Sequence, residues 1–362
     1  MISRLNLYQR YLIRETFASV FLVLAAFLAL FAFFNFIDEL RTVGKAGYSV
    51  VHAALFVALS MPGLVYELIP IATLIGTLYA LSTLARHSEI TVLRASGLAT
   101  SDLLMTLFRA ALLLALLTFV IGEAVVPFSE RLGKEIRAKA LSTVIAQSGF
   151  DSGLWVKDGR SFINIRKAAP DEPLEGVRIY HFSQQNLLES VTDAQAADFE
   201  DPDLWRLRGV VRTVLEGDTS RVESTQTGEW RSTVTPTLLA ALMVSPERMS
   251  LFGLLNYTKH LTENKQKTER YEIALWKKVV YPLAALVMVA LALPFGYSHN
   301  RVGGVSLKIF AGVMLGILFY ALNGLSSNLG AINSWSPIIS ATAPSGLFLL
   351  VATGMLWWVE RR

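Results

Sequence analysis

A short polar loop between two long apolar segments, residues 85–97, holds side chains suited to recognising a partner. Its candidate contact residues are Arg86, Glu89, Ile90, Leu93 and Arg94. Ile90 and Leu93 are three residues apart, so a short helix would place both on one face, with charged side chains at its edges. Gly97 suits the position just after a helix end. Apolar anchors at this spacing predict docking into a groove of an ATPase on the cytoplasmic side; a turn lying on the membrane surface is the alternative.

Three ionisable residues fall inside apolar segments, where charges usually face a cavity or a partner. Arg109 lies near one end of its segment, so its long side chain can extend to the membrane surface. Glu123 lies about one helical turn from the opposite surface, which favours a structural role. Glu67 follows Pro62, a residue that bends helices, and is a candidate for lining a cavity.

Motifs for hydrolysing ATP or binding a metal are absent from the sequence. No G-x-x-x-x-G-K-[ST] occurs, and residues 303–308 lack both its spacing and its strand context. The 5 histidines form no metal-like cluster, and cysteine is absent. The net charge of +4, without a basic block, gives no indication of nucleic-acid binding. We therefore expect no catalytic residue, metal or cofactor in this chain, and ATP hydrolysis by a partner.

The composition indicates that much of the surface faces lipid. Only 17% of the 362 residues are charged and 53% are hydrophobic, with a mean hydropathy of +0.45. Soluble proteins carry roughly 25% charged residues, and about 20 apolar residues in a helix cross a bilayer. The sequence predicts six such helices: Thr16–Ile37, Ala54–Leu84, Leu103–Val126, Trp276–Leu293, Leu307–Asn323 and Ile338–Val359. They form two membrane units, residues 1–126 and 271–362.

Lysine and arginine in the short loops predict the orientation of these helices, because cytoplasmic loops are enriched in both. One side would receive Arg4, Arg10, Arg14, Arg86, Arg94, Arg301, Lys308, Arg361 and Arg362. The short loops of the other side hold only Arg41 and Lys45. We therefore expect both termini and residues 85–97 in the cytoplasm, and residues 127–270 on the outer side of the membrane.

Residues 127–270 are too polar to be embedded in a membrane and show a pattern of short strands. Apolar runs recur between turn signals: Leu154–Val156, Phe162–Ile165, Val177–Phe182, Val210–Leu215 and Glu229–Arg231. Asp158-Gly159 between the first two runs is a strong hairpin signal. Runs of this length predict a sandwich, jelly roll or open barrel. Ser250 can cap a connecting helix over about Leu251–Leu261.

These features together resemble the YjgP/YjgQ family, the LptF/LptG permeases of lipopolysaccharide export. The resemblance rests on the loop Ser88-Glu-Ile-Thr-Val-Leu-Arg-Ala-Ser-Gly97, on Gly153-Leu-Trp-Val-Lys-Asp-Gly159, and on three helices either side of an outward β domain. It covers nearly the whole chain, although permeases of other ABC exporters carry similar loops. Three further stretches resemble the LptG type more than the LptF type: Phe36–Leu40, Gly122-Glu123-x-x-x-Pro127 and Trp155–Asp158.

The resemblance implies a membrane α-helical protein with six transmembrane helices and an inserted periplasmic all-β, jelly-roll-like domain. It implies a subunit that extracts lipopolysaccharide from the inner membrane and passes it to a periplasmic bridge toward the outer membrane. An LptF-like paralogue would complete the cavity, an LptB-like ATPase dimer would bind below, and an LptC-like bitopic protein would join through its own helix. Glu89 would be the acidic residue that contacts the ATPase, with Arg94 close by.

Lipopolysaccharide bears phosphates, so the family resemblance also implies cations near the outer surface. The candidate substrate-binding residues are Arg41, Lys45, Lys134 and Arg137. Lys134 and Arg137 are three residues apart and would share a helical face. Asn35 and Thr42 depart from the family pattern, which has lysine there in some members, and Lys45 could compensate. Lys277 and Lys278 are a further candidate pair; ordinary anchoring at the headgroups is the alternative for all six cations.

Other functions are weighed by topology. A MacB/FtsX-type lipoprotein or peptide exporter has its outer domain between helices one and two of four, whereas here the domain lies between helices three and four of six. An LptF-type subunit remains an alternative within the family. An intramembrane protease or lipid transferase would need a convergent nucleophile or acid–base pair, and a scaffold would not need the loop at residues 85–97.

Overall fold

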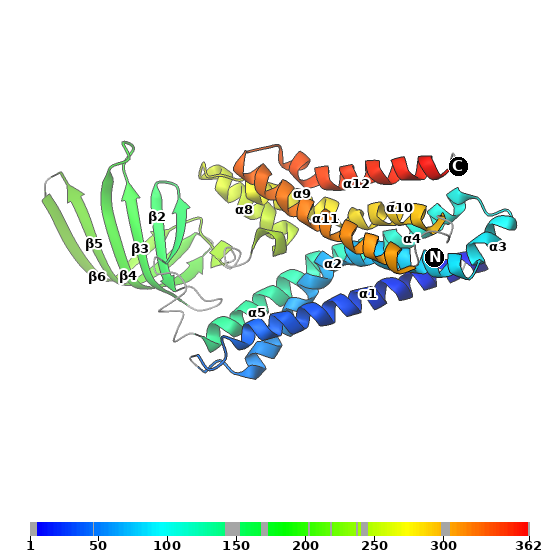
Figure 1. Ribbon diagram of the computed structural model, residues 1–362. Helices are drawn as coiled ribbons and strands as arrows, with labels where there is room; N and C mark the ends of the chain where they lie inside the picture. Colours follow the sequence, from blue (N-terminus) through cyan, green and yellow to red (C-terminus); the bar gives the residue numbers. More distant parts are fainter. Residues whose placement is uncertain are drawn as a thin grey trace.

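The molecule is elongated, with a bundle of helices at one end and a β-sheet at the other (Figure 1). The computed structural model describes residues 6–45, 47–141, 153–167, 173–201, 203–217, 219–236, 238–239, 245–297 and 305–360. The first helix begins and the last helix ends at the end of the bundle farthest from the sheet, beside the short helix α3 (Glu89–Ala95) (Figure 1). Four of the basic residues that predict the orientation lie outside the described residues: Arg4, Arg301, Arg361 and Arg362.

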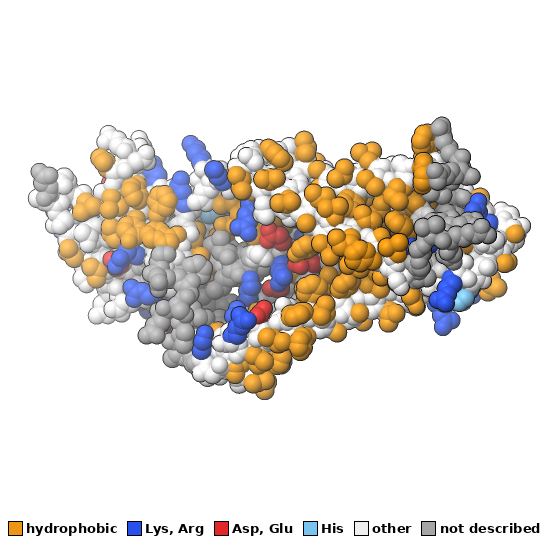
Figure 2. Space-filling view, in the orientation of Figure 1, with side chains coloured by type: hydrophobic (Ala, Val, Ile, Leu, Met, Phe, Trp, Pro, Cys, Tyr) orange, Lys and Arg blue, Asp and Glu red, His pale blue; other side chains and the backbone are white. Residues whose placement is uncertain are grey.

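Six helices among the described residues are long and apolar enough to span a membrane, as the sequence predicted. Their bounds are Leu7–Leu40, Val50–Arg86, Ser101–Arg137, Glu269–Phe295, Ser306–Ile332 and Pro337–Trp358. The first five are longer than their predicted ranges, because helices continue past the apolar core into the polar layer, and the sixth has the predicted length, shifted by one residue. Hydrophobic side chains cover the bundle in a broad band on the face shown in Figure 2, as contact with lipid requires.

The helical elements are listed here in chain order. They are α1 (Leu7–Leu40), α2 (Val50–Arg86), α3, α4 (Thr100–Val120), the π-turn η2 (Ile121–Val125), α5 (Val126–Ala140), the 3₁₀ turn η3 (Pro246–Arg248), α8 (Leu251–Glu263), α9 (Glu269–Val280), the 3₁₀ turn η4 (Tyr281–Leu283), α10 (Ala284–Tyr297), α11 (Val305–Ile332) and α12 (Pro337–Glu360). The prediction that Ser250 caps a connecting helix is confirmed, since its side chain accepts a hydrogen bond from the Gly253 N–H at 3.0 Å.

The third span does not end at Val126, where the sequence predicted. It passes from α4 through η2 into α5, which ends at Ala140. Pro127 lies in the first turn of α5 and has no N–H to donate to the preceding turn. The proline therefore lies at the junction of the two halves of the span, which the π-turn marks.

Helix α2 is the centre of the bundle and packs against α1, α5, α10 and α11. It stays helical through Pro62 and Pro70, and nearly every residue from Leu68 to Leu84 is buried. Small residues permit the closest contacts. A Cβ on Gly76 would lie 2.6 Å from the Val20 Cα, so the backbones of α1 and α2 touch at this glycine.

The inserted domain is all-β, as predicted, and consists of one six-stranded antiparallel sheet. The strands are β1 (Leu154–Asp158), β2 (Ser161–Lys167), β3 (Leu174–Phe182), β4 (Leu188–Asp201), β5 (Leu204–Glu216) and β6 (Thr219–Arg231). They pair in sequential order, and the hairpin at Asp158-Gly159 is confirmed. Among the described strands the topology is a meander, without the crossover connections of a jelly roll built from two Greek keys.

One face of this sheet carries the core of the domain. Ile163 and Ile165 of β2 point into it, as does Trp205 of β5, and all three are almost fully buried. The chain after β6 covers the same face. The Trp205 indole N–H donates to the Val234 carbonyl oxygen at 2.8 Å, which ties this segment down before it returns to the bundle.

The glycine contact between α1 and α2 makes a stability prediction. Gly76→Ala should lower the free energy of unfolding by about 1–3 kcal/mol, the usual cost of overpacking a tight core. Gly354→Ala in α12 is the matched control, because a Cβ there meets nothing within 4 Å and alanine favours a helix over glycine. Thermal unfolding of the detergent-solubilised protein, followed by tryptophan fluorescence, measures both. Equal melting temperatures for the two variants would contradict the close contact.

Candidate functional site: the two polar ends of the bundle

The end of the bundle far from the sheet is formed by α3, between α2 and α4. The helix ends at Ala95, and Gly97 adopts a left-handed φ of 93° with its N–H bonded to the Arg94 carbonyl oxygen. The predicted helix and its glycine stop are therefore confirmed. Ser88 before it also has a left-handed φ, 60°, which is uncommon for a residue other than glycine. This bend sets α3 against the end of α2.

Ile90 does not offer a docking surface, contrary to the predicted shared face with Leu93. It is 6% exposed and belongs to the same core cluster as Leu12 and Leu103, from α1 and α4. The physical reason is that a seven-residue helix needs an anchor of its own, and Ile90 supplies it. Leu93 is half-buried, whereas Val92 is 64% exposed.

The charged residues of α3 lie around this exposed valine. Arg86 and Arg94 are exposed, and Glu89 is half-buried. The Glu89 carboxylate lies near the Tyr11 hydroxyl of α1. The acidic side chain of α3 is therefore close to the first helix of the bundle.

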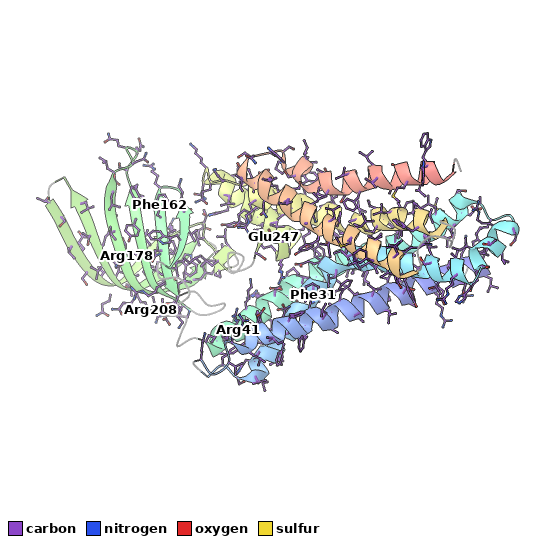
Figure 3. All side chains as sticks on the ribbon, viewed as in Figure 1. Phe31, Arg41, Phe162, Arg178, Arg208 and Glu247 are labelled. Atoms are coloured by element: carbon purple, nitrogen blue, oxygen red, sulfur yellow. The ribbon has the colours of Figure 1, made fainter. Side chains whose placement is uncertain are left out.

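At the opposite end of the bundle, Arg41 and Lys45 are both exposed in the turn between α1 and α2. Arg41 follows the last residue of α1 and makes an open ion pair with Asp38 at 3.7 Å. Its side chain is 80% exposed, so this ion pair is screened by water and weak. Figure 3 places Arg41 at the end of α1 that faces the sheet.

Arg137 and Lys134 both belong to α5 and have different charged neighbours. The Arg137 Nε lies 2.9 Å from Glu39 Oε1, and its guanidinium carbon lies 5.0 Å from the centre of the Phe56 ring. Lys134 is half-buried, and the charges that act on it are those of Glu130, which attracts it, and Arg248, which repels it. The two cations are three residues apart in α5, as predicted, but they face different carboxylates, Glu39 for Arg137 and Glu130 for Lys134.

Glu39 is the buried partner that fixes Arg137. It is 8% exposed and also accepts a hydrogen bond from the Tyr48 hydroxyl at 2.8 Å. Burial of Tyr48, together with this hydrogen bond, raises the pKa of its hydroxyl well above the usual value. The hydroxyl therefore stays protonated and keeps donating. Arg137 is partly neutralised in this arrangement, unlike Arg41.

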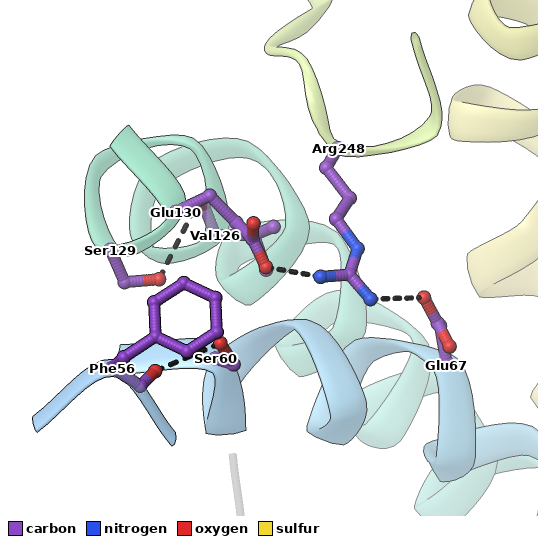
Figure 4. A network of polar contacts seen from close by, with 7 residues as sticks. All are labelled: Phe56, Ser60, Glu67, Val126, Ser129, Glu130 and Arg248. Carbon is purple, nitrogen blue, oxygen red and sulfur yellow. Dashed lines mark hydrogen bonds and ion pairs between the residues drawn. The ribbon is translucent and has the colours of Figure 1, made fainter. Parts of the chain in front are cut away.

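A network that the sequence did not predict lies between the bundle and the sheet. Arg248 of η3 forms ion pairs with Glu130 of α5 and with Glu67 of α2, the latter at 3.4 Å (Figure 4). Burial acts to lower the Arg248 pKa, but the charges of Glu130 and Glu67 outweigh it and raise the pKa. Arg248 thus stays cationic. Figure 2 shows acidic and basic side chains gathered between the hydrophobic band and the β domain.

A second buried ion pair lies close to this network. Lys278 of α9 is 4% exposed, lies 3.7 Å from Glu123 of η2, and donates to the Met249 carbonyl oxygen. The acidic residues whose charges act on the neighbouring Lys277 are Glu247 and Glu67. The structural role predicted for Glu123 agrees with these contacts. Lys278 is buried against Glu123 and Met249, which does not favour the phosphate contact considered for it.

One sequence signal for the missed residues did exist. Glu67 and Glu123 lie in apolar segments, so each needs a cation or a donor. The sequence could not predict which residue is the partner, because Arg248 is 181 residues from Glu67 in the chain. Among the described residues, no group of three or more His, Asp or Glu is placed to hold a metal ion.

Comparison with known proteins agrees with this architecture. The family model described as "Lipopolysaccharide export system permease LptF/LptG" matches residues 10–360. The chain belongs to the LptF/LptG family. It is 33% identical to the lipopolysaccharide export system permease protein LptG of Escherichia coli K12 over 98% of each chain. It is 31% identical to LptG of Haemophilus influenzae over 99% of each.

The LptF type matches less of the chain. LptF of Escherichia coli K12 is 32% identical over 139 residues, 36% of either chain. The full-length similarity to LptG relatives thus favours the LptG type, as the three distinguishing stretches predicted. Membership of this family also excludes the MacB/FtsX-type alternative.

Proposed function

We propose that this chain is the LptG-type membrane subunit of an exporter that extracts lipopolysaccharide from the inner membrane. The substrate would pass to a periplasmic bridge toward the outer membrane. The observation that carries the proposal is similarity over nearly the full length to relatives named as lipopolysaccharide export permeases. In support, the chain has two polar ends separated by an apolar bundle, one formed by α3 and the other by the sheet (Figure 1).

The α3 end would face the cytoplasm and bind a separate ATPase of the LptB type, which would supply all ATP hydrolysis. Val92 is the exposed apolar contact, and Glu89, Arg86 and Arg94 are the charged contacts. Ile90 would hold α3 to its own bundle, so a push on the helix would reach α2 and α4 directly. Leu93, which is half-buried, could contribute both to the attachment of α3 and to the contact with the ATPase.

The other end would face the periplasm and hold the phosphates of the substrate. Arg41 and Lys45 are the best candidates, because both are exposed at the outer end of the bundle. To bind a phosphate, Arg137 would have to give up its ion pair with Glu39. Lys134 would have to move away from the charge of Glu130. These two residues are therefore suited to a later step, when the bundle has changed shape.

An LptF-like paralogue and an LptC-like protein would complete the complex. Helix α1 supports such a pairing, since only 17% of its most apolar window is buried within this chain. The exposed side chains include Phe21, Phe31 and Phe34. A face of this kind meets either lipid or a partner helix, and a permease that encloses a cavity with a paralogue needs such a face.

The ATPase contact is tested by Glu89→Ala. Loss of a charge-assisted contact costs about 1.5–3 kcal/mol, so binding of the ATPase should weaken roughly 10- to 100-fold while membrane insertion is unchanged. Asp102→Asn is the control, an exposed acid in the first turn of α4 at the same end. Co-purification and export in proteoliposomes give the measurement. Export at the parental rate with a normally bound ATPase would contradict the assignment of Glu89.

The substrate site is tested by Arg41→Gln combined with Lys45→Gln. Removing two exposed cations should reduce photocrosslinking to lipopolysaccharide by roughly tenfold or more, because each charged contact contributes about 1.5–3 kcal/mol. The control is Lys259→Gln, whose side chain is 77% exposed on α8. Crosslinking that stays at the parental level in the double variant would remove Arg41 and Lys45 from the site.

A further inference from the structure

Helix α8 begins on the third membrane span. Both carboxylate oxygens of Glu123, in η2, accept the N–H of Leu251 at 3.0 and 2.9 Å. Leu251 is the first residue of α8, and the first N–H groups of a helix have no partner within it. A carboxylate there is favoured by the helix dipole as well. The Glu123 side chain of the π-turn thus caps the N-terminus of α8, a helix in the segment that connects the sheet back to the bundle.

The residues just before α8 are attached to three other elements of the bundle. Arg248 pairs with Glu130 of α5 and Glu67 of α2 (Figure 4). The carbonyl oxygen of Met249 accepts from the buried Lys278 of α9. Within the four residues Arg248–Leu251, three are therefore bound to the bundle. Their partners are charged side chains of α2, α5, α9 and η2. This attachment is made at the membrane end of α8.

The other end of α8 is attached to the sheet. Asn264, which follows its last residue, accepts the Gly159 N–H of the β1–β2 turn at 2.6 Å. Asp158 of the same turn accepts hydrogen bonds from Ser232 and Thr233, just after β6, at 2.6 and 2.7 Å through their hydroxyls. Asn264 is 8% exposed. The contact thus joins α8 to both edge strands of the domain at one place.

Between these attachments α8 is stiff. It has 13 residues, which corresponds to a length of about 20 Å. Leu254, Tyr257 and Leu261 are buried in one cluster with Ala274 of α9, and the rings of Tyr257 and Tyr271 lie 4.6 Å apart. A packed helix of this length cannot absorb a displacement of one end by bending.

We propose that α8 transmits movement of the third membrane span to the β domain, with Glu123 as the positioning residue at its membrane end. This rests on the proposed function, since an exporter must change the shape of its bundle during its cycle. The π-turn is suited to start the movement: π-turns occur at functional sites, and returning this one to α geometry would rotate Glu123 about the helix axis. Its two hydrogen bonds to Leu251 would then pull on α8, and Asn264 would pull on the sheet.

The experiment measures movement of the sheet in the complete complex with its ATPase. The chain has no cysteine, so two introduced cysteines, Leu187→Cys in the β3–β4 turn and Val50→Cys at the start of α2, take spin labels at exposed sites. Pulsed electron paramagnetic resonance gives the distance between the two spin labels without nucleotide and with vanadate-trapped ATP. In the parent this distance should shift. In Glu123→Ala and in Asn264→Ala the shift should be lost, although the two residues lie at opposite ends of α8.

Three further variants make the result decisive. Glu123→Gln keeps one oxygen acceptor and the size of the side chain, so it should fold and retain part of the shift. Combining Glu123→Ala with Asn264→Ala should add nothing to either single change, because both interrupt one path. Glu263→Gln is the control, because the Glu263 side chain is 58% exposed on α8. This variant should show the same shift of the label-to-label distance as the parent.

The outcomes separate the two proposals. A parental shift in both Glu123→Ala and Asn264→Ala overturns transmission through α8, whatever the export rate. A parent complex that exports lipopolysaccharide while its sheet stays still also overturns it, and leaves the export function standing. A parent that neither binds an ATPase nor exports overturns the proposed function, and the transmission proposal with it.

Discussion

The arrangement of this protein depends on one electrostatic requirement. Glu67, Glu123 and Glu130 belong to helices long and apolar enough to span a membrane, and a carboxylate there is costly unless a cation or donor meets it. The bundle itself supplies Lys278, and the remaining partners come from Arg248 and the N-terminus of α8. Neutralising these carboxylates therefore also fixes where the chain re-enters the bundle. The same contacts that make the acids tolerable determine where the sheet lies.

This requirement gives the two polar ends different characters. At the α3 end Arg86 and Arg94 are exposed near Val92, Glu89 is half-buried, and Ile90 is the buried residue that attaches the helix. At the sheet end most acids and bases are already paired, and Arg41 and Lys45 are the exposed cations among the predicted substrate residues. An exposed, lightly attached end suits a partner that binds and pushes. A paired and packed end suits an element that must move as a unit.

Much of the fold could be predicted because its signals are local. Hydropathy predicted six helices, Asp158-Gly159 the hairpin, and Ser250 the start of α8. Strand β4 was missed because its alanines and acids have little strand preference, and pairing with β3 and β5 decides its structure. Helical spacing predicted a face containing Ile90 but not which way that face points. The ion pairs of Arg248 join residues far apart in the chain, so no local pattern predicts them, although unpaired acids in apolar segments indicated that partners exist.

The central proposal is that α3 and the sheet lie on opposite sides of the inner membrane, separated by the helical bundle. Single cysteines at two exposed positions, Val92→Cys in α3 and Leu187→Cys in the sheet, test it in a chain without native cysteine. A membrane-impermeant maleimide applied to intact spheroplasts should label Leu187→Cys alone, and inverted inner-membrane vesicles should give label at Val92→Cys alone. Labelling of both positions from the same side would contradict the account.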